Sequence, residues 1–367
     1  MNIIHSGAKY SAIVGIGENL RKLQRETGEE YLFLNRGVNS VVPIDLTEVV
    51  GNIDFNSPAI QVYPPNAGAP NLKEAINEVY FHGRADTDLI SISGGSMSAL
   101  DQIFTMLEVE KILLPSFYWG AYANVCRIRG KAFDVYHTLE ELEERQDELK
   151  NSLVVICDPN NPVGNKLSDE DVLQVIRSLS DHGVTVVYDS PYRRVFYDDD
   201  DEMYIRLMDL ENVLIVESFS KCVGLSGQRI GFVWSNDHDF IKEFNLRILY
   251  VHNGVNGFAQ QLVYQLLASP EGKKAVKEFK EKTREDIRKN IEYLRAKGFL
   301  AEEFYQDSEP MGIFAIANRS YDELMEKRIG SVPLDFFTRD EKEKAKKYAR
   351  ICISVPHEKL KEFFDRF

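Results

Sequence analysis

The chain has 367 residues, of which 44% are hydrophobic and 28% charged, a composition typical of globular proteins with a substantial core. Its 44 Lys and Arg residues against 58 Asp and Glu residues give a net charge of -14. This charge argues against binding nucleic acid or an anionic membrane through the overall field of the protein. At roughly 100–200 residues per domain, the length predicts two domains, or one large domain with an added lobe.

The cysteines and the N-terminus indicate the cellular compartment. Cys126, Cys157, Cys222 and Cys352 form no C-x-x-C pair, which argues against a zinc site or a disulfide framework and is typical of a reducing compartment. The first residues, MNIIHSGAKYSAIVG, lack the basic stretch and long apolar run of a signal peptide. The long uncharged stretch ILLPSFYWGAYANVC is too short to span a membrane. We therefore expect a cytoplasmic protein with a small-molecule or protein partner.

Between residues 72 and 235, short apolar segments alternate with amphipathic ones. Strands are predicted at 88–93, 111–115, 151–158, 183–189, 212–219 and 229–235, and helices at 72–82, at 96–107 and from Ser168 to about His182. Ser168 is a predicted N-cap, with Asp171 three residues later. This alternation predicts an α/β fold with a large, doubly wound and mostly parallel sheet covered on both faces.

The C-terminal third has a different pattern. Residues 271–298 form a long, charged predicted helix, and strand-like pieces follow at 312–317 and 350–355. We expect an N-terminal arm at 1–35 that packs with a small domain, a large domain at 36–270, and the small α+β domain at 271–367. The acidic run at 198–202 predicts a solvated loop.

Polar residues follow five of the predicted strands, and ligands of open α/β sheets bind beyond the carboxyl ends of the strands. In chain order these segments are Gly94–Ser96, Ser116–Trp119, Pro159–Gly164, Asp189–Tyr192 and Ser218–Lys221, with Arg229 further on. Together they supply an anion cup, an aromatic group, an amide, a carboxylate and a lysine with hydroxyls. This set suits an aldehyde cofactor with a phosphate tail and a pyridine ring, because a lysine can form a Schiff base with the aldehyde and a carboxylate can keep the ring nitrogen protonated. Helix N-terminal N–H groups and an arginine bind phosphate.

Three motifs carry a resemblance to a known family. They are SFSKCVGLSGQRIG at 218–231, DPNNPVG at 158–164 and YPPNAGAPNLKEAI at 63–76. In them the chain resembles the class I/II aminotransferases, which are fold-type-I pyridoxal-phosphate enzymes, and it is nearest in motif to the aspartate and aromatic aminotransferases. The resemblance implies a pyridoxal 5'-phosphate cofactor, transfer of an amino group from an L-amino acid to a 2-oxo acid, and a homodimer with a shared active site.

The resemblance also implies a role for each matching residue. Lys221 is implied as the Schiff-base lysine that moves a proton between the substrate and the cofactor. Asp189 is implied to pair with the pyridinium nitrogen, and Asn161 and Tyr192 to bond the phenolic oxygen. The implied phosphate ligands are Gly95, Ser96, Met97, Ser218 and Arg229, with Tyr63 reaching the phosphate of the neighbouring subunit. The family usually has Asp-Glu-x-Tyr where this chain has Asp-Ser-Pro-Tyr at 189–192.

The aromatic residue that stacks on the cofactor stays open at this point. A register that matches the Trp-Gly-Asn-His segment of aspartate aminotransferases selects Trp119, and it makes Tyr122 the support of Asp189. A different register selects Phe117 or Tyr118.

The substrate is less well defined than the cofactor. Arg350 matches the arginine that binds the substrate α-carboxylate, and Gly37 lies in a segment, 35–38, that resembles the loop closing over the substrate. Arg247 resembles an arginine that binds the distal carboxylate of a dicarboxylic substrate from the partner subunit. However, its interval from Lys221 is shorter than in aspartate aminotransferases, so dicarboxylic and aromatic substrates both stay open. We predict no metal site.

Other functions share these cofactor residues. A C–S lyase, a decarboxylase or a cyclase would use the same set, and Arg350 favours transamination over them. A transcriptional regulator with an aminotransferase-like domain is disfavoured by the acidic charge and by the roughly 30 residues that precede the cofactor-domain pattern.

Overall fold

The computed structural model describes residues 1–367, and its largest element is a seven-stranded sheet with the order β2-β9-β8-β7-β5-β3-β4. The strands are β2 (Ile90–Ser93), β3 (Ile112–Pro115), β4 (Phe133–Tyr136), β5 (Leu153–Cys157), β7 (Thr185–Asp189), β8 (Val213–Ser218) and β9 (Gly231–Trp234). Neighbouring strands are parallel except at β9, which runs antiparallel to β2 and β8. The predicted α/β fold with a mostly parallel sheet is confirmed.

The central strands form from continuous apolar runs because the sheet is covered on both faces. All five residues of β5, LVVIC, are buried. The edge strand β4, FDVY, is only half buried along its length, and its short alternating pattern was not predicted as a strand.

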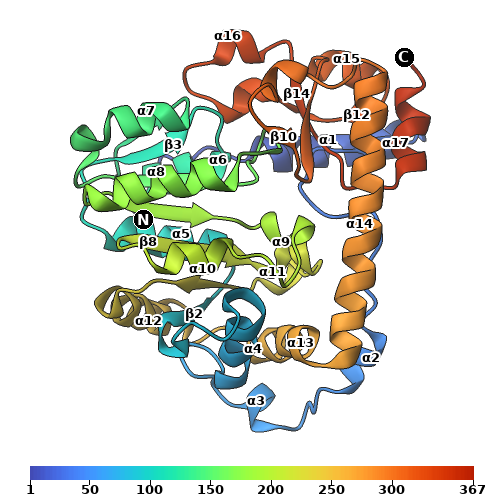
Figure 1. The fold of residues 1–367 in the computed structure, drawn as a ribbon. Coiled ribbons are helices and arrows are strands. Elements are labelled where there is room, and N and C mark those ends of the chain that lie inside the picture. Colours follow the sequence, from blue (N-terminus) through green and yellow to red (C-terminus); the bar gives the residue numbers. More distant parts are fainter.

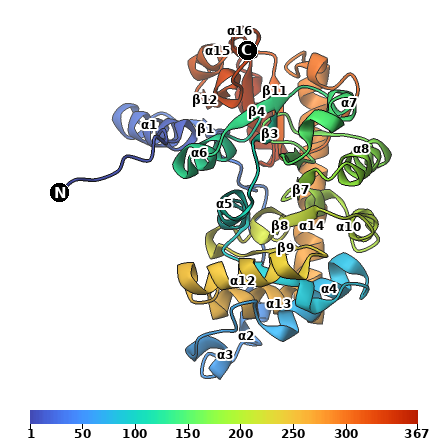
Figure 2. The same ribbon diagram turned by 90° about the vertical axis from the view of Figure 1, so that its left-hand side faces the viewer.

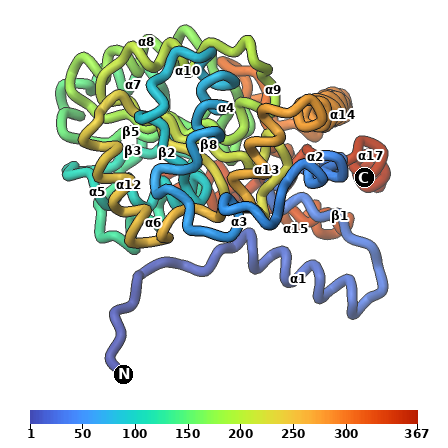
Figure 3. Tube along the Cα trace, turned by 90° about the horizontal axis from the view of Figure 1, so that it is seen from below, coloured from blue at the N-terminus to red at the C-terminus, as the bar shows by residue number.

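Helices cover both faces of the sheet (Figures 2 and 3). One face carries α7 (Leu139–Glu144), α8 (Asp169–Asp181) and α10 (Met203–Met208), and the other carries α5 (Ser96–Met106), α6 (Gly120–Arg129) and α12 (His238–His252). The capped start predicted for α8 is confirmed, because the Ser168 hydroxyl accepts a bond from the Asp171 N–H at 3.3 Å.

Helix α14 (Pro270–Ala296) runs along one side of the molecule and joins its two lobes (Figure 1). Near its start, Val276 packs against the larger hydrophobic core, and further on Ile287 and Leu294 belong to a smaller one. The smaller core contains an antiparallel sheet of β11 (Phe314–Ala317), β14 (Ala349–Cys352) and β13 (Val332–Pro333).

The N-terminal region lies against the C-terminal lobe. Strand β1 (Leu32–Phe33) pairs in parallel with β12 (Ile329–Gly330). Helix α1 (Ala12–Thr27) approaches Gly330 so closely that a Cβ there would lie 2.1 Å from Leu20, which a glycine avoids. The N-terminal end of the chain extends away from the body of the molecule (Figure 3).

Among the remaining elements, α4 (Pro70–Phe81) and α13 (Gly257–Ala268) are the longest helices, and they pack against each other. The others are short: α2 (Thr47–Gly51), α3 (Pro58–Gln61), β6 (Asn165–Lys166), α9 (Arg193–Phe196), α11 (Phe219–Cys222), β10 (Glu309–Pro310), α15 (Tyr321–Glu326), α16 (Lys342–Ala345) and α17 (His357–Phe364). None of the helices is both long and apolar enough to cross a membrane.

The structure corrects the prediction that the whole acidic run at 198–202 is a solvated loop. Asp198, Asp199 and Asp200 are exposed, as a solvated loop requires, but Asp201 is buried. Its carboxylate accepts bonds from Arg193 at 2.7 and 2.6 Å. Asp201 is therefore buried because the structure supplies a buried cation to pair with it.

The packing of α14 gives a stability prediction. The buried Asn290 side chain donates to the carbonyl oxygens of Ile353 and Val355, both at 2.9 Å. Asn290→Leu would leave both carbonyls buried without a donor, so we expect the free energy of unfolding to fall by about 2–4 kcal/mol, measured by urea unfolding. The control Arg288→Ala removes an exposed side chain from the same helix and should change this free energy by less than about 0.5 kcal/mol. Equal effects of the two substitutions would contradict the prediction.

Candidate active site

The carboxyl ends of the parallel strands open onto a cavity of about 530 Å³. Because β9 runs the other way, its first residues lie at the same edge, and this brings Arg229 into the cavity wall. Eleven of the predicted site residues line the cavity: Gly37, Ser96, Met97, Trp119, Asn161, Asp189, Tyr192, Ser218, Lys221, Arg229 and Arg350.

The cavity carries an excess of positive charge. Its basic side chains are Arg36, Lys221, Arg229 and Arg350, and Asp189 is its only carboxylate. None of these five side chains forms an ion pair within the protein. Such a cavity suits a ligand with at least two anionic groups.

Asp189 ends strand β7 and is 1% exposed. One carboxylate oxygen, Oδ2, accepts a hydrogen bond from the Tyr122 hydroxyl, and the other, Oδ1, is buried without any partner. Burial raises the pKa of Asp189 to about 7, although the bond from Tyr122 lowers it. A protonated ring nitrogen is the kind of group that would satisfy the free oxygen.

Lys221 lies in α11, directly after β8, and its ammonium group donates to the carbonyl oxygen of Gly37. Burial lowers the pKa of Lys221 to about 8, and the nearby arginines act in the same direction. At that pKa about a tenth of the amine is neutral at pH 7, which makes it a usable nucleophile and base. Position 37 requires a glycine, because a Cβ there would lie 2.3 Å from the ring of Phe314.

An anion cup forms where α5 begins. Gly95, with φ +86°, is the N-cap of α5, and a Cβ on it would lie 2.8 Å from the Arg229 guanidinium. Arg229 also donates to the Ser226 carbonyl at 3.0 Å and to the Ser220 hydroxyl at 3.4 Å, and the Ser218 hydroxyl donates to that of Ser220 at 2.9 Å. Helix N–H groups, a guanidinium and two hydroxyls thus converge on one point, which is a phosphate-binding arrangement.

Arg350 is held in place but not neutralised. Its guanidinium donates to Asn161 Oδ1 at 3.1 Å and to the Asn35 carbonyl at 2.5 Å, while its Nε is buried without a partner. It lies over the rings of Phe314 and Phe337, at 4.2 and 4.6 Å, and burial lowers its pKa to about 10. A buried cation without a counter-ion favours binding of a carboxylate.

Asn161 connects Arg350 to Tyr192. Its amide nitrogen donates to the Tyr192 hydroxyl at 2.9 Å, while its oxygen accepts the bond from Arg350. Tyr192 is buried, and its ring packs edge-on against Phe314 at 5.6 Å.

The three aromatic candidates for stacking have different places. Trp119 lines the cavity and packs edge-on against Tyr122, with 5.5 Å between the ring centroids. Phe117 packs on Phe304 and Tyr118 on Phe133, and neither lines the cavity.

Three predicted residues do not line the cavity: Gly95, which caps α5 beside Arg229, and Tyr63 and Arg247. Tyr63 is 79% exposed. Arg247, in α12, pairs with Glu243 at 2.7 Å. Tyr63 and Arg247 were both predicted to act on the neighbouring subunit.

Other cavity residues were given no role from the sequence. Ser220 belongs to the motif around Lys221, and its place between Ser218 and the lysine was the available signal. Ile13 and Phe314 come from α1 and β11, far from every motif, and no sequence signal could have found them.

The buried charge of Asp189 gives a pH-dependent prediction. Its folded pKa of about 7 lies above the ordinary value of 3.8, so the folded protein binds more protons than the unfolded chain between these pH values, and stability falls as pH rises through them. We expect Asp189→Asn without cofactor to be more stable than the parent at pH 8, by up to about 4 kcal/mol, and the gap to close near pH 4.

Thermal and urea unfolding of the cofactor-free proteins at both pH values measures this gap. The control Asp147→Asn, at a side chain that is 91% exposed, should show almost none. A gap for Asp189→Asn that is the same at pH 4 and pH 8 would count against a buried charge.

Comparison with known proteins supports the same interpretation. Residues 46–367 match the model of the family described as aminotransferase class I and II. The aspartate aminotransferase of Pyrococcus horikoshii is 28% identical over 328 residues, which cover 83% of this chain and 81% of the relative. The aromatic-amino-acid aminotransferase 2 of Thermococcus litoralis is 25% identical over 373 residues, which cover 91% of this chain and 92% of the relative.

A solved structure has the same fold. The aspartate aminotransferase from Thermus thermophilus with maleate superimposes with a TM-score of 0.82 at 22% identity, over 100% of this chain and 99% of that one. The match of the family model over most of the chain, with the shared fold, shows that this chain belongs to the class I and II aminotransferases and is a pyridoxal-phosphate-dependent transferase of fold type I.

Proposed function

We propose that this aminotransferase uses Lys221 as its reacting amine and takes dicarboxylic and aromatic L-amino acids, passing the amino group to a 2-oxo acid. One observation carries the proposal. A single cavity holds the Lys221 amine, an Asp189 oxygen without a partner and the Arg350 guanidinium without a counter-ion. These groups are complementary to an amine-reactive aldehyde, a protonated ring nitrogen and a substrate carboxylate.

The residues of the cavity fit pyridoxal 5'-phosphate. Asp189 Oδ1 lacks the donor that a ring nitrogen would supply, and the missing Cβ of Gly95 lets Arg229 approach the start of α5. The resulting cup of Ser96, Ser218 and Arg229 suits the phosphate. When bound, this cofactor supplies an aldehyde that condenses with amines and a ring that withdraws electrons from the substrate Cα.

The protein contributes position and proton transfer. Asp189 would hold a proton on the ring nitrogen, Asn161 and Tyr192 would bond the ring oxygen, and Trp119 would pack against the ring. Arg350 binds the α-carboxylate of the substrate with two parallel bonds. The Lys221 amine, once free, would take the proton from the substrate Cα and deliver it to the cofactor, and its lowered pKa suits both tasks.

The outer part of the cavity suits two kinds of substrate side chain. Ile13, Val38 and Phe314 supply apolar surface for an aromatic ring, and the Arg36 guanidinium forms no hydrogen bond or ion pair within the protein. A second carboxylate could therefore bind within the same chain at Arg36, or at Arg247 of a neighbouring subunit.

We also propose a homodimer in which Tyr63 of each subunit reaches the phosphate bound by the other. Large apolar side chains are exposed beside the cup: Val62 at 60%, Tyr63 at 79%, Tyr250 at 82% and Val251 at 55%. The end of α12 lies next to the segment with Tyr63, because a Cβ on Gly254 would lie 2.9 Å from Pro64. Exposed apolar patches of this kind favour association.

A cytoplasmic location is part of the same proposal. All four cysteines are free and buried, which suits a reducing compartment.

A panel of amino acids tests the activity. We expect glutamate, aspartate or phenylalanine, added without an acceptor, to bleach the visible band of the cofactor-loaded protein, and 2-oxoglutarate to restore it. Lys221→Ala should abolish the visible band and lower turnover at least about 10³-fold, because the proton-transferring amine is gone. The control Lys277→Ala, at a side chain that is 74% exposed, should behave as the parent. Release of pyruvate and ammonia from cysteine without an acceptor would instead indicate a C–S lyase.

The dimer proposal gives a prediction for Tyr63. Tyr63→Phe removes a hydroxyl bond to a charged phosphate, so we expect the Kd for pyridoxal 5'-phosphate to rise about 10- to 100-fold while light scattering still reports a dimer. The control Tyr321→Phe, in the C-terminal lobe, should leave the Kd unchanged. An unchanged Kd for Tyr63→Phe, or a monomeric parent, would refute the shared site.

A further inference from the structure

Five charged side chains form a largely buried network next to the loops that carry Asn161 and Tyr192. They are Asp158, Lys166, Asp169, Arg193 and Asp201, and only Asp169, at 26%, has a side chain more than a tenth exposed. None of them lines the active-site cavity.

Lys166 closes the loop that carries Asn161. Its ammonium group lies 2.8 Å from Asp158, which begins this loop, and 2.7 Å from Asp169 at the start of α8. The Leu167 N–H also donates to Asp158 at 3.1 Å. Residues 158–166 are thus fixed at their base, with Asn161 near the tip.

Arg193 directly follows Tyr192 and makes two bidentate contacts. Two of its nitrogens donate to the two oxygens of Asp169, both at 2.8 Å, and two donate to those of Asp201 at 2.7 and 2.6 Å. Burial opposes the ionisation of Asp169, but the bonds from Arg193 and Lys166 outweigh it and hold the pKa of Asp169 at about 2. Asp169 therefore stays charged over the working pH range.

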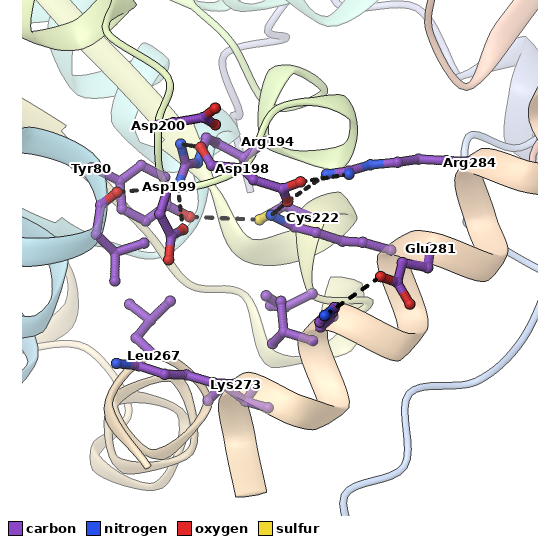
Figure 4. Close-up of a pocket in the computed structure, with 16 residues that line it drawn as sticks. Tyr80, Arg194, Asp198, Asp199, Asp200, Cys222, Leu267, Lys273, Glu281 and Arg284 are labelled. Carbon is purple, nitrogen blue, oxygen red and sulfur yellow. Dashed lines mark hydrogen bonds and ion pairs between the residues drawn. The ribbon is translucent and has the colours of Figure 1, made fainter. Parts of the chain in front are cut away.

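The segment after Tyr192 is also held by a residue of α14, Arg284, which reaches Asp198 (Figure 4). Arg284 of α14 donates to both oxygens of Asp198, at 2.7 and 2.6 Å, and to the Val195 carbonyl at 2.8 Å. These contacts border a second cavity of about 510 Å³, which Cys222 lines and Lys221 does not. Arg284 thus offers a comparison, because it makes the same kind of contact to the same segment away from the active site.

Buried charge networks are seldom the most stabilising way to fill space, since apolar side chains of similar volume often do as well. What this network supplies is direction, because bidentate pairs fix both distance and orientation. The loops it fixes meet at one bond of 2.9 Å, between Asn161 and Tyr192. A shift of either loop would change how both side chains face the cavity.

We propose that Arg193 is a positioning residue, whose two carboxylate pairs fix the Tyr192 segment against the Asn161 loop so that both side chains meet the cofactor's ring oxygen together. The inference rests on the proposed function, because it is the assigned role of Tyr192 and Asn161 that gives their alignment a consequence.

Arg193→Lys tests this, because it keeps the charge and removes the planar fork. Hydrogen bonds to the ring oxygen favour its anionic form, so misplaced donors should raise the pH midpoint of the visible absorbance. We expect the midpoint of the cofactor-loaded protein to rise by about 0.5–1 pH unit and kcat to fall about 10-fold.

Two comparisons separate positioning from a merely structural role. Arg284→Lys should lower the thermal unfolding temperature without moving the absorbance midpoint. In a Tyr192→Phe background, Arg193→Lys should move the midpoint by less than about 0.2 pH unit further, because residues that act through one another are not additive. The proposal is overturned if Arg193→Lys lowers the unfolding temperature but leaves the absorbance midpoint unmoved. It is also overturned if the midpoint shift of Arg193→Lys adds in full to that of Tyr192→Phe.

If Arg193→Lys does not fold, Asp201→Asn gives the same readout, because it leaves the pair between Arg193 and Asp169 in place. The midpoint is read without any amino acid. A parent protein that binds the cofactor but turns over no amino acid would therefore count against the proposed function and not against this inference.

Discussion

The active site depends on a carboxylate buried before it has a full set of partners. Asp189 has one oxygen bonded to Tyr122 and one bonded to nothing, at a position that is 1% exposed. Leaving an ionised group so placed costs stability, and the raised pKa expresses this cost. The basic residues that line the same cavity also lack counter-ions within the protein. Both signs of charge are thus left unpaired within the protein, and an anionic ligand with a cationic ring nitrogen would pair with both.

The second organising constraint is the seam between the two cores. Cys157 ends a strand of the large sheet, and Phe117, Val163 and Tyr192 follow such strands, yet the side chains of all four belong to the smaller core. This places the carboxyl ends of the large sheet against β11 and β14, and so brings Arg350 to the cavity. Helix α14 crosses the same seam and contributes to both cores.

Much of the fold was predictable because its signals are local. Apolar runs such as LVVIC and the cap at Ser168 depend on neighbours in the sequence, and the strand-end rule then located about half of the cavity residues. The edge strand β4, the antiparallel course of β9 and the burial of Asp201 depend on partners distant in the chain, and local patterns do not contain them. The division of the chain at residue 271 stays a prediction: α14 begins at Pro270, and its early residue Val276 still packs against the larger core. So do the roles of the individual site residues.

Phe314 shows how closely the parts of this site are linked. Its ring closes on Gly37, lies under the Arg350 guanidinium and supports the edge of Tyr192. One side chain therefore borders the loop over the lysine, the carboxylate site and a cofactor contact together. New substrate preferences would be hard to acquire at this position, since any change of shape there disturbs three tasks. The side chains of Ile13 and Val38 also border the cavity but do not contact these three groups together. Variation among descendants of this protein should therefore accumulate there first.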